Sequence, residues 1–94
     1  EDISVPTLIH PTAYVSPEAS LGAGVVVLPK AVINIGTTVE AGCIVNLSAI
    51  VDHDCILEEG CHLCPGVIVK AANRISAGAK LESGTVLLNG TYPL

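Results

Sequence analysis

The fold is decided by the stretch Ile44–Cys61, which reads IVNLSAIVDHDCILEEGC. It consists of three consecutive six-residue units, IVNLSA, IVDHDC and ILEEGC, each with two aliphatic residues at its start and a small residue at its end. The same division extends without an insertion from Leu8 to Thr91. The chain is therefore an array of one short unit, which indicates a solenoid.

The columns of this array predict β-structure. The second position of every unit is aliphatic and the sixth is small almost throughout, while the fifth collects glycines: Gly24, Gly36, Gly42, Gly60, Gly66, Gly78, Gly84 and Gly90. An inward aliphatic residue followed by a glycine-rich corner describes a short strand and a tight bend. Neither the 3.6-residue period of a helix nor the turn signals of hairpins fit this pattern.

Composition and charge exclude several classes of function. The net charge of -5, with four Lys and Arg residues in all, argues against nucleic-acid binding and against an anionic membrane surface, because both need basic patches. No apolar run approaches the ~20 residues of a membrane-spanning helix, and no signal-peptide pattern opens the chain. We therefore expect a soluble, cytoplasmic protein. A domain of 94 residues buries only about 60 to 65% of its unfolded surface when it stands alone, so oligomerisation is also expected.

The cysteines are interpreted as core residues. Of the four cysteines, Cys43, Cys55, Cys61 and Cys64, the first three stand in a column where the neighbouring turns carry Ala, Val or Thr, as small buried residues do. The segment 61–64, Cys-His-Leu-Cys, looks like half of a zinc site but has no second half at a useful spacing. No metal is therefore expected.

The hexad resembles that of the left-handed parallel β-helix proteins. The resemblance implies an all-β fold in which three hexads make one triangular coil, so that this chain has somewhat under five coils. Stacked coils place residues eighteen apart side by side at roughly 4.8 Å, the spacing of paired strands. On one face this register aligns an unbroken apolar stripe: Tyr14, Val32, Ile50, Ile68 and Val86. We expect this stripe to be the interface of a homotrimer; the alternative is that its side chains flatten against their own face.

One unit, at 50–55, differs from all the others in holding a histidine between two carboxylates. The register places uncharged residues on both sides of His53. Asp52 is aligned with Lys70, and an ion pair between them explains Asp52 without any catalysis. Asp54 is aligned with no charged residue. Asp54 is therefore the better candidate for a carboxylate that orients His53 as a general base.

At these residues a family resemblance becomes specific. The stretch Ile44–Ile56, continued by His62 and Pro65-Gly66, resembles the catalytic region of the hexapeptide acyltransferases of the sialic acid O-acetyltransferase and bacillosamine N-acetyltransferase group. The opening Leu8–Pro17 is similar to the first coil of the same group, so that the resemblance covers nearly the whole chain. It implies transfer of an acetyl group from acetyl-CoA to an amine or hydroxyl of a sugar or nucleotide sugar.

Carried over residue by residue, the resemblance makes His53 the general base, Asp54 the acid that supports it, and His62 a contact of acetyl-CoA. Ala71 and Ser83 fall where the family's backbone meets the pantetheine arm. The chemistry suits these residues, because an amine or hydroxyl that attacks a thioester loses a proton, which a neutral imidazole can accept.

Two further features of the reaction need partners. The tetrahedral oxyanion needs hydrogen-bond donors, which we expect to be backbone N–H groups near Gly60 or Gly66. The phosphates of acetyl-CoA have candidate partners in Lys70, Arg74 and Lys80, for which ordinary solubilising charge is the alternative interpretation.

Members of the group carry an N-terminal α/β domain of the Rossmann type that binds the nucleotide sugar. We therefore expect residues 1–94 to be a β-helix acyltransferase domain that lacks this N-terminal domain and a C-terminal cap, and whose activity in isolation is open. Two other interpretations remain. One is a non-catalytic β-helix that serves as a trimerisation or scaffold module. The other is a γ-class carbonic anhydrase on the same fold, for which His10, His53 and His62 lack the zinc-ligand spacing.

Overall fold

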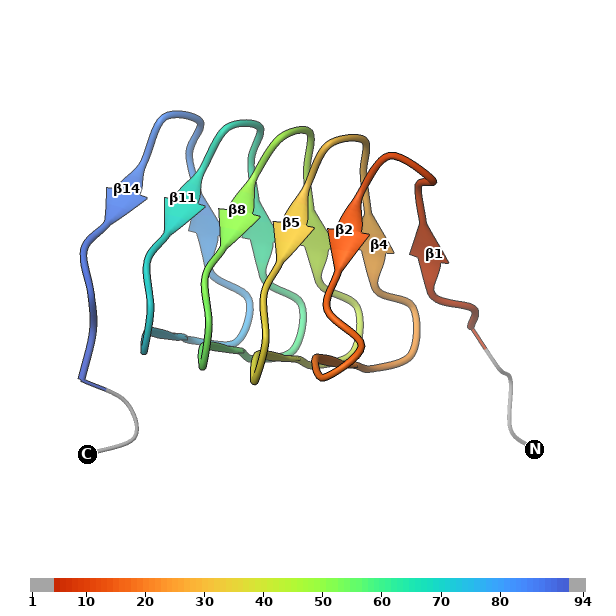
Figure 1. The fold of residues 1–94 in the computed structure, drawn as a ribbon, viewed down its shortest axis with the longest axis horizontal. Helices are drawn as coiled ribbons and strands as arrows, with labels where there is room; N and C mark the ends of the chain where they lie inside the picture. The colour runs from red at the N-terminus through yellow and green to blue at the C-terminus, as the bar shows by residue number, and fades with distance from the viewer. Residues whose placement is uncertain (1–4, 92–94) are drawn as a thin grey trace.

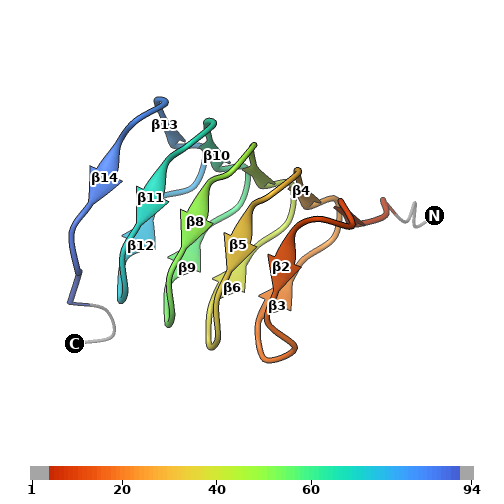
Figure 2. The same ribbon diagram turned by 45° about the horizontal axis from the view of Figure 1, so that its top comes forward.

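Fourteen two-residue strands, joined by four-residue corners, wind into a triangular coil in the computed structural model, which describes residues 5–91. Every third strand pairs in parallel, which gives three flat sheets (Figure 1 and Figure 2). Sheet A contains β1 (Leu8–Ile9), β4 (Val26–Val27), β7 (Ile44–Val45), β10 (His62–Leu63) and β13 (Lys80–Leu81). Sheet B contains β2 (Tyr14–Val15), β5 (Val32–Ile33), β8 (Ile50–Val51), β11 (Ile68–Val69) and β14 (Val86–Leu87). Sheet C contains β3 (Ser20–Leu21), β6 (Thr38–Val39), β9 (Ile56–Leu57) and β12 (Arg74–Ile75).

The coil is left-handed. In Figure 1 the strands of sheet B run down the front and those of sheet A run up the back while the chain advances toward the C-terminus. Fourteen strands at three per turn make four full coils and two strands of a fifth, which confirms the expected number. None of the described segments is a helix that could cross a membrane.

The eighteen-residue register is confirmed on all three faces. Tyr14 pairs with Val32 in sheet B, Ser20 with Thr38 in sheet C and Leu8 with Val26 in sheet A, in each case eighteen residues on. The apolar stripe expected on one face is therefore the outward row of sheet B, in which Tyr14 is 52%, Ile50 38% and Val86 52% exposed. The register thus leaves an apolar ladder facing outward along one side of the prism.

The core is built from the second and sixth positions of the hexad. The second strand residue points inward, and Ile33, Val51 and Leu57 are fully buried. The small residues of the sixth position turn the chain at each corner, and all four cysteines are buried free thiols, as expected. Branched aliphatic side chains suit this stacking because the same residue type repeats on the pleated surface of each coil.

Three sets of corners join the sheets. Corner AB joins sheet A to sheet B at 10–13, 28–31, 46–49 and 64–67, with 82–85 before β14. Corner BC joins sheet B to sheet C at 16–19, 34–37, 52–55 and 70–73, and corner CA joins sheet C to sheet A at 22–25, 40–43, 58–61 and 76–79. The fifth hexad position has a positive φ in most corners, which explains its glycines; Lys30, Ser48, Asp54 and Ala72 adopt the same left-handed conformation without being glycine.

The stacking begins earlier than Leu8, where the sequence-based division started. The carbonyl of Val5 accepts a hydrogen bond of 3.0 Å from the N–H of Gly24, as the carbonyl of Ala23 does from Gly42 at 2.9 Å. Val5 therefore belongs to a corner CA of a preceding coil. In the first complete coil, the inward Ile9 is still 46% exposed, whereas Val27 one coil later is 1% exposed.

Candidate active site

His53 lies at corner BC, directly after β8, and its side chain is half exposed. Its Nδ1 lies 2.8 Å from Oδ2 of Asp54, so the contact expected between the two is present. Because an ionised carboxylate only accepts hydrogen bonds, Nδ1 carries the hydrogen and the lone pair is on Nε2. Among the described residues no group hydrogen-bonds to Nε2, so that nitrogen is available to take a proton from another molecule.

The expected ion pair between Asp52 and Lys70 is wrong. Oδ1 of Asp52 instead accepts hydrogen bonds from Nδ2 of Asn34 at 3.1 Å and from the backbone N–H of His53 at 2.8 Å. The ion pairs within residues 5–91 are His53–Asp54 and Arg74–Glu58. The register aligns the two charges, but the carboxylate of Asp52 bonds to the Asn34 amide and the local N–H instead.

His62 is the first residue of β10, on the outward row of sheet A, and is half buried. Its Nε2 lies 3.1 Å from Nδ2 of Asn46, which belongs to corner AB one coil earlier. Oδ1 of Asn46 accepts the N–H of Leu47 at 2.8 Å, so the amide's NH₂ group is the one that faces the imidazole. An NH₂ group donates; His62 Nε2 is therefore the accepting nitrogen, and the ring hydrogen is on Nδ1.

One chain does not bring all the predicted site residues together. His53 and Ala71 are stacked neighbours at corner BC, whereas His62 lies on sheet A and Ser83 on corner AB. In a triangular coil, corner BC is the vertex opposite sheet A. His53 and His62 consequently point away from one chain in different directions. His10, at corner AB, accepts the N–H of Thr12 at its Nδ1, 3.1 Å away, which is a local turn contact.

The N–H groups of Gly60 and Gly66 themselves are not free to act as oxyanion donors. The N–H of Gly60 donates to the carbonyl of Ala41 at 3.0 Å, and that of Gly66 donates to the carbonyl of Leu47 at 2.9 Å. These bonds belong to the regular stacking of corners, which the hexad pattern does not reveal. The N–H groups of these two glycines are therefore already used within the coil.

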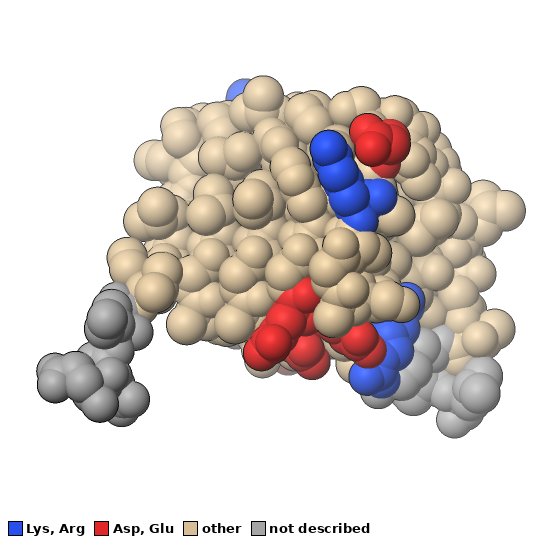
Figure 3. All heavy atoms as spheres, turned by 180° about the vertical axis from the view of Figure 1, so that it is seen from behind, with Lys and Arg blue, Asp and Glu red and all other residues tan. Residues whose placement is uncertain are grey.

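The cationic side chains differ in their surroundings. Arg74 is engaged by the carboxylate of Glu58, which also accepts the N–H of Ala77, so Arg74 is not a simple phosphate partner. Lys70 and Lys80 are exposed. On the side seen in Figure 3, the Lys and Arg side chains are few and stand apart from one another. Within residues 5–91 no three His, Cys, Asp or Glu side chains converge on a point where a metal ion could be held.

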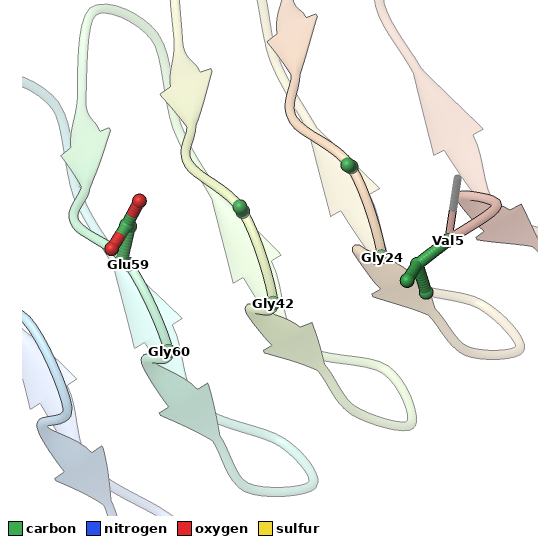
Figure 4. Close-up of a pocket in the computed structure, with 7 residues that line it drawn as sticks. Val5, Gly24, Gly42, Glu59 and Gly60 are labelled. Carbon is green, nitrogen blue, oxygen red and sulfur yellow. The ribbon is translucent and has the colours of Figure 1, made fainter. Parts of the chain in front are cut away.

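A shallow apolar groove of about 570 Å³ runs along corner CA, away from His53. Figure 4 shows Val5 at one end and Glu59 at the other, with Gly24 and Gly42 between them. The groove exists because the fourth and fifth positions of this corner are small, with Ala23 and Ala41 beside the glycines. It carries no histidine and takes no part in the His53 site.

The sequence-based interpretation missed three residues that support His53. They belong to corner BC of the preceding coil, at 34–37, and contact the 52–55 bend. Asn34 and Thr37 form hydrogen bonds with it, and Gly36 lies close to Asp54. The signal that pointed to them was their offset of eighteen residues from Asp52, Asp54 and Cys55.

No family model and no curated protein sequence matches the chain. Among solved structures, the acetyltransferase domain of PglB from Neisseria gonorrhoeae FA1090 is 42% identical, with a TM-score of 0.74, over 88% of this chain and 43% of that chain. The same domain in complex with acetyl coenzyme A gives the same values. A mutant of perosamine N-acetyltransferase from Caulobacter crescentus, in complex with CoA and GDP-perosamine, is 22% identical over 88% of this chain and 51% of that chain, with a TM-score of 0.46.

The chain thus spans less than half the length of the PglB chain that it matches, and the match includes most of the coil described above. Two features agree between the sequence and the structure: the hexad array and the left-handed triangular coil. With the 42% identity to the PglB domain, they lead to one conclusion. The chain belongs to the hexapeptide-repeat acyltransferase family of left-handed β-helix proteins.

Proposed function

We propose that the chain is the β-helix of an acetyl-CoA-dependent acetyltransferase that modifies an amine or hydroxyl of a sugar or nucleotide sugar. The observation that carries the proposal is the 2.8 Å contact between His53 Nδ1 and Asp54 Oδ2, in a chain 42% identical to an acetyltransferase domain solved with acetyl coenzyme A. The sugar acceptor follows from the family resemblance of Ile44–Ile56.

The proposed chemistry assigns one proton to His53. The acceptor nitrogen or oxygen forms a bond to the thioester carbonyl carbon, and its proton moves to Nε2 of His53. Asp54 stabilises the imidazolium through Nδ1–H. When the tetrahedral intermediate collapses, the carbon–sulfur bond breaks, and the imidazolium returns the proton to the sulfur of CoA. No covalent enzyme intermediate is needed.

We further propose a cyclic homotrimer with sheet B facing the three-fold axis. Its outward row, Tyr14, Val32, Ile50, Ile68 and Val86, is apolar along the whole prism and partly exposed in the single chain. A chain of this size that exposes such a row gains by burying it against copies of itself. In a cyclic trimer every copy buries the same surface, so no copy keeps the outward row of sheet B exposed.

Such a trimer places two vertices side by side at each subunit boundary. With sheet B toward the axis, corner BC of one subunit lies against corner AB and sheet A of the next. His53 and Ala71 of one subunit then face His62 and Ser83 of the partner subunit. The proposed contacts of acetyl-CoA lie apart on one chain, and the trimer brings them to a single cleft. There, Nδ1–H of the partner subunit's His62 is a hydrogen-bond donor for acetyl-CoA.

The test is a calorimetric titration of acetyl-CoA into the purified chain, with the mass in solution measured by light scattering. We expect micromolar binding by a trimer, and release of CoA thiol when amino-sugar nucleotides are supplied. His53→Ala should lower the rate of CoA release by about 100-fold or more, the usual contribution of a general base, while binding of acetyl-CoA persists. His10→Ala is the matched control and should keep the wild-type rate. A folded trimer that binds no acetyl-CoA would contradict the proposal and favour a scaffold module.

A further inference from the structure

The bend that holds His53 rests on one preceding corner, 34–37. The carbonyl of Ile35 accepts the N–H of Asp54 at 3.0 Å, and Nδ2 of Asn34 donates to Oδ1 of Asp52 at 3.1 Å. Thr37 is almost completely buried; its Oγ1 donates to the carbonyl of Asp52 at 2.8 Å and accepts the N–H of Cys55 at 3.2 Å. Both ends of the bend are therefore fixed by hydrogen bonds from the coil before it.

Between these fixed ends, the carboxylate of Asp54 occupies the space over Gly36. A Cβ atom added to Gly36 would overlap Oδ1 of Asp54 and lie 3.1 Å from Cγ of Asp54, so the carboxylate would have to move. Oδ2 of the same carboxylate bonds to Nδ1 of His53. The carboxylate thus lies between Gly36 on one side and the imidazole of His53 on the other.

The backbone alone does not explain this glycine. Gly36 has a φ of +75°, a conformation that costs L-residues energy. Ala72 nevertheless adopts a φ of 61° in the same column of the same corner, so alanine is compatible with the turn. At Gly42, on another corner of the same coil, φ is +74° and an added Cβ meets nothing within 4 Å. Unlike Gly42, Gly36 has a carboxylate directly above it.

We propose that Gly36 is a positioning residue for the general base: by having no side chain, it admits the Asp54 carboxylate to the place from which that carboxylate holds His53 as the Nδ1–H tautomer. This rests on the proposed function for its catalytic consequence, since only an enzyme needs the lone pair on Nε2. An alanine at position 36 would turn the flexible Asp54 side chain away from the ring while the coil remained folded.

The experiment compares Gly36→Ala with the matched variant Gly42→Ala, which carries the same backbone cost without the carboxylate. The ring ¹⁵N chemical shifts of His53, recorded where the ring is neutral, report its tautomer and need no substrate. We expect the Nδ1–H form to predominate in wild type and in Gly42→Ala, and a mixture of both tautomers in Gly36→Ala. The kcat of Gly36→Ala should fall at least about tenfold, while its KM for acetyl-CoA stays at the wild-type value.

A second variant shows whether Gly36 acts through Asp54. In an Asp54→Ala background, adding Gly36→Ala should change neither tautomer nor kcat further. A Gly36→Ala chain that fails to fold, while the Gly36→Ala/Asp54→Ala double variant folds, would also support the close contact. An unchanged tautomer in Gly36→Ala, or a further change of tautomer or kcat when Gly36→Ala is added to Asp54→Ala, would overturn the inference. A wild-type chain without acetyltransferase activity would count against the proposed function, while the tautomer comparison would still decide the role of Gly36.

Discussion

Nδ2 of Asn46 lies 3.1 Å from Nε2 of His62, and this contact decides which ring nitrogen carries the hydrogen. Replacement by alanine removes the donor, so Asn46→Ala should give His62 a mixture of tautomers in its ring ¹⁵N spectrum. The dissociation constant for acetyl-CoA should rise roughly 2- to 12-fold, the equivalent of one neutral hydrogen bond. Glu40→Ala, at the same hexad position on corner CA, should change neither quantity. An unaltered His62 spectrum in Asn46→Ala would show that the contact does not select the tautomer.

The separation of His53 and His62 on one chain predicts complementation between inactive variants. His53→Ala and His62→Ala subunits, mixed in equal amounts, unfolded and refolded together, should regain activity. With random assembly of a cyclic trimer, a boundary has both native residues in one half times one half of cases, or about a quarter of the wild-type sites. A site contained in a single chain would give no activity in the mixture beyond the sum of the two variants.

The apolar row of sheet B predicts a charge-sensitive interface. Ile50, at its centre, is 38% exposed in the single chain, and Ile50→Lys would place an ammonium group in each copy of a buried contact. We expect the mass in solution to fall from that of a trimer to that of a monomer. Thr38→Lys, on the outward row of sheet C, should keep the trimer mass. Trimers formed by Ile50→Lys would exclude this face as the interface.

The four cysteines should be unreactive in the native protein. Burial raises the pKa of the Cys61 thiol to about 11 and raises the pKa values of Cys43 and Cys55, so the thiolate form is rare near neutral pH. The aromatic disulfide DTNB should label no thiol in the folded chain and all four after unfolding in denaturant. Rapid labelling of a native thiol would show that a corner opens locally.

Glu58 predicts how stability depends on acid. Its hydrogen bonds from Arg74 and from the N–H of Ala77 lower the pKa of its carboxyl below the usual 4.5. The carboxylate is therefore favoured in the folded state, and its stabilisation is complete above pH 4.5 and lost as the pH falls through the lower, folded-state pKa. The free energy of unfolding of Glu58→Gln should decline less steeply in that acid range than that of wild type. Parallel pH curves for the two proteins would contradict this assignment.

The repeat made the fold predictable at the level of single residue pairs. Because every unit has the same length, and because the resemblance implies three units per coil, counting predicts the pairing of Tyr14 with Val32 and the outward position of Ile50. Position along an array does not determine side-chain partners, however. The register aligned Asp52 with Asn34 on one side and Lys70 on the other, and Asp52 bonds to Asn34 and to a local N–H rather than to Lys70.

The site was predictable in composition and less so in its support. His53 and Asp54 stood out because neither is aligned with a charged residue in the coils before and after. The structure places His53 Nδ1 in contact with Asp54 Oδ2. The contribution of Gly36 was hidden because glycine also satisfies the turn at equivalent corners, such as Gly42. For a related reason the N–H groups of Gly60 and Gly66 are not free to act as oxyanion donors: they donate to carbonyls of the preceding coil.

The constant eighteen-residue offset between stacked neighbours has a consequence for how such chains can change in length. An insertion of eighteen residues between Thr37 and Asp52 keeps every later residue on its own face, yet it gives the His53 bend a different supporting corner. An insertion or deletion of six residues keeps every aliphatic residue inward, but it rotates the rest of the chain by one face. His62 is then no longer on sheet A. Length variation that spares both the core and the site is therefore confined to whole coils added or lost outside residues 34–83.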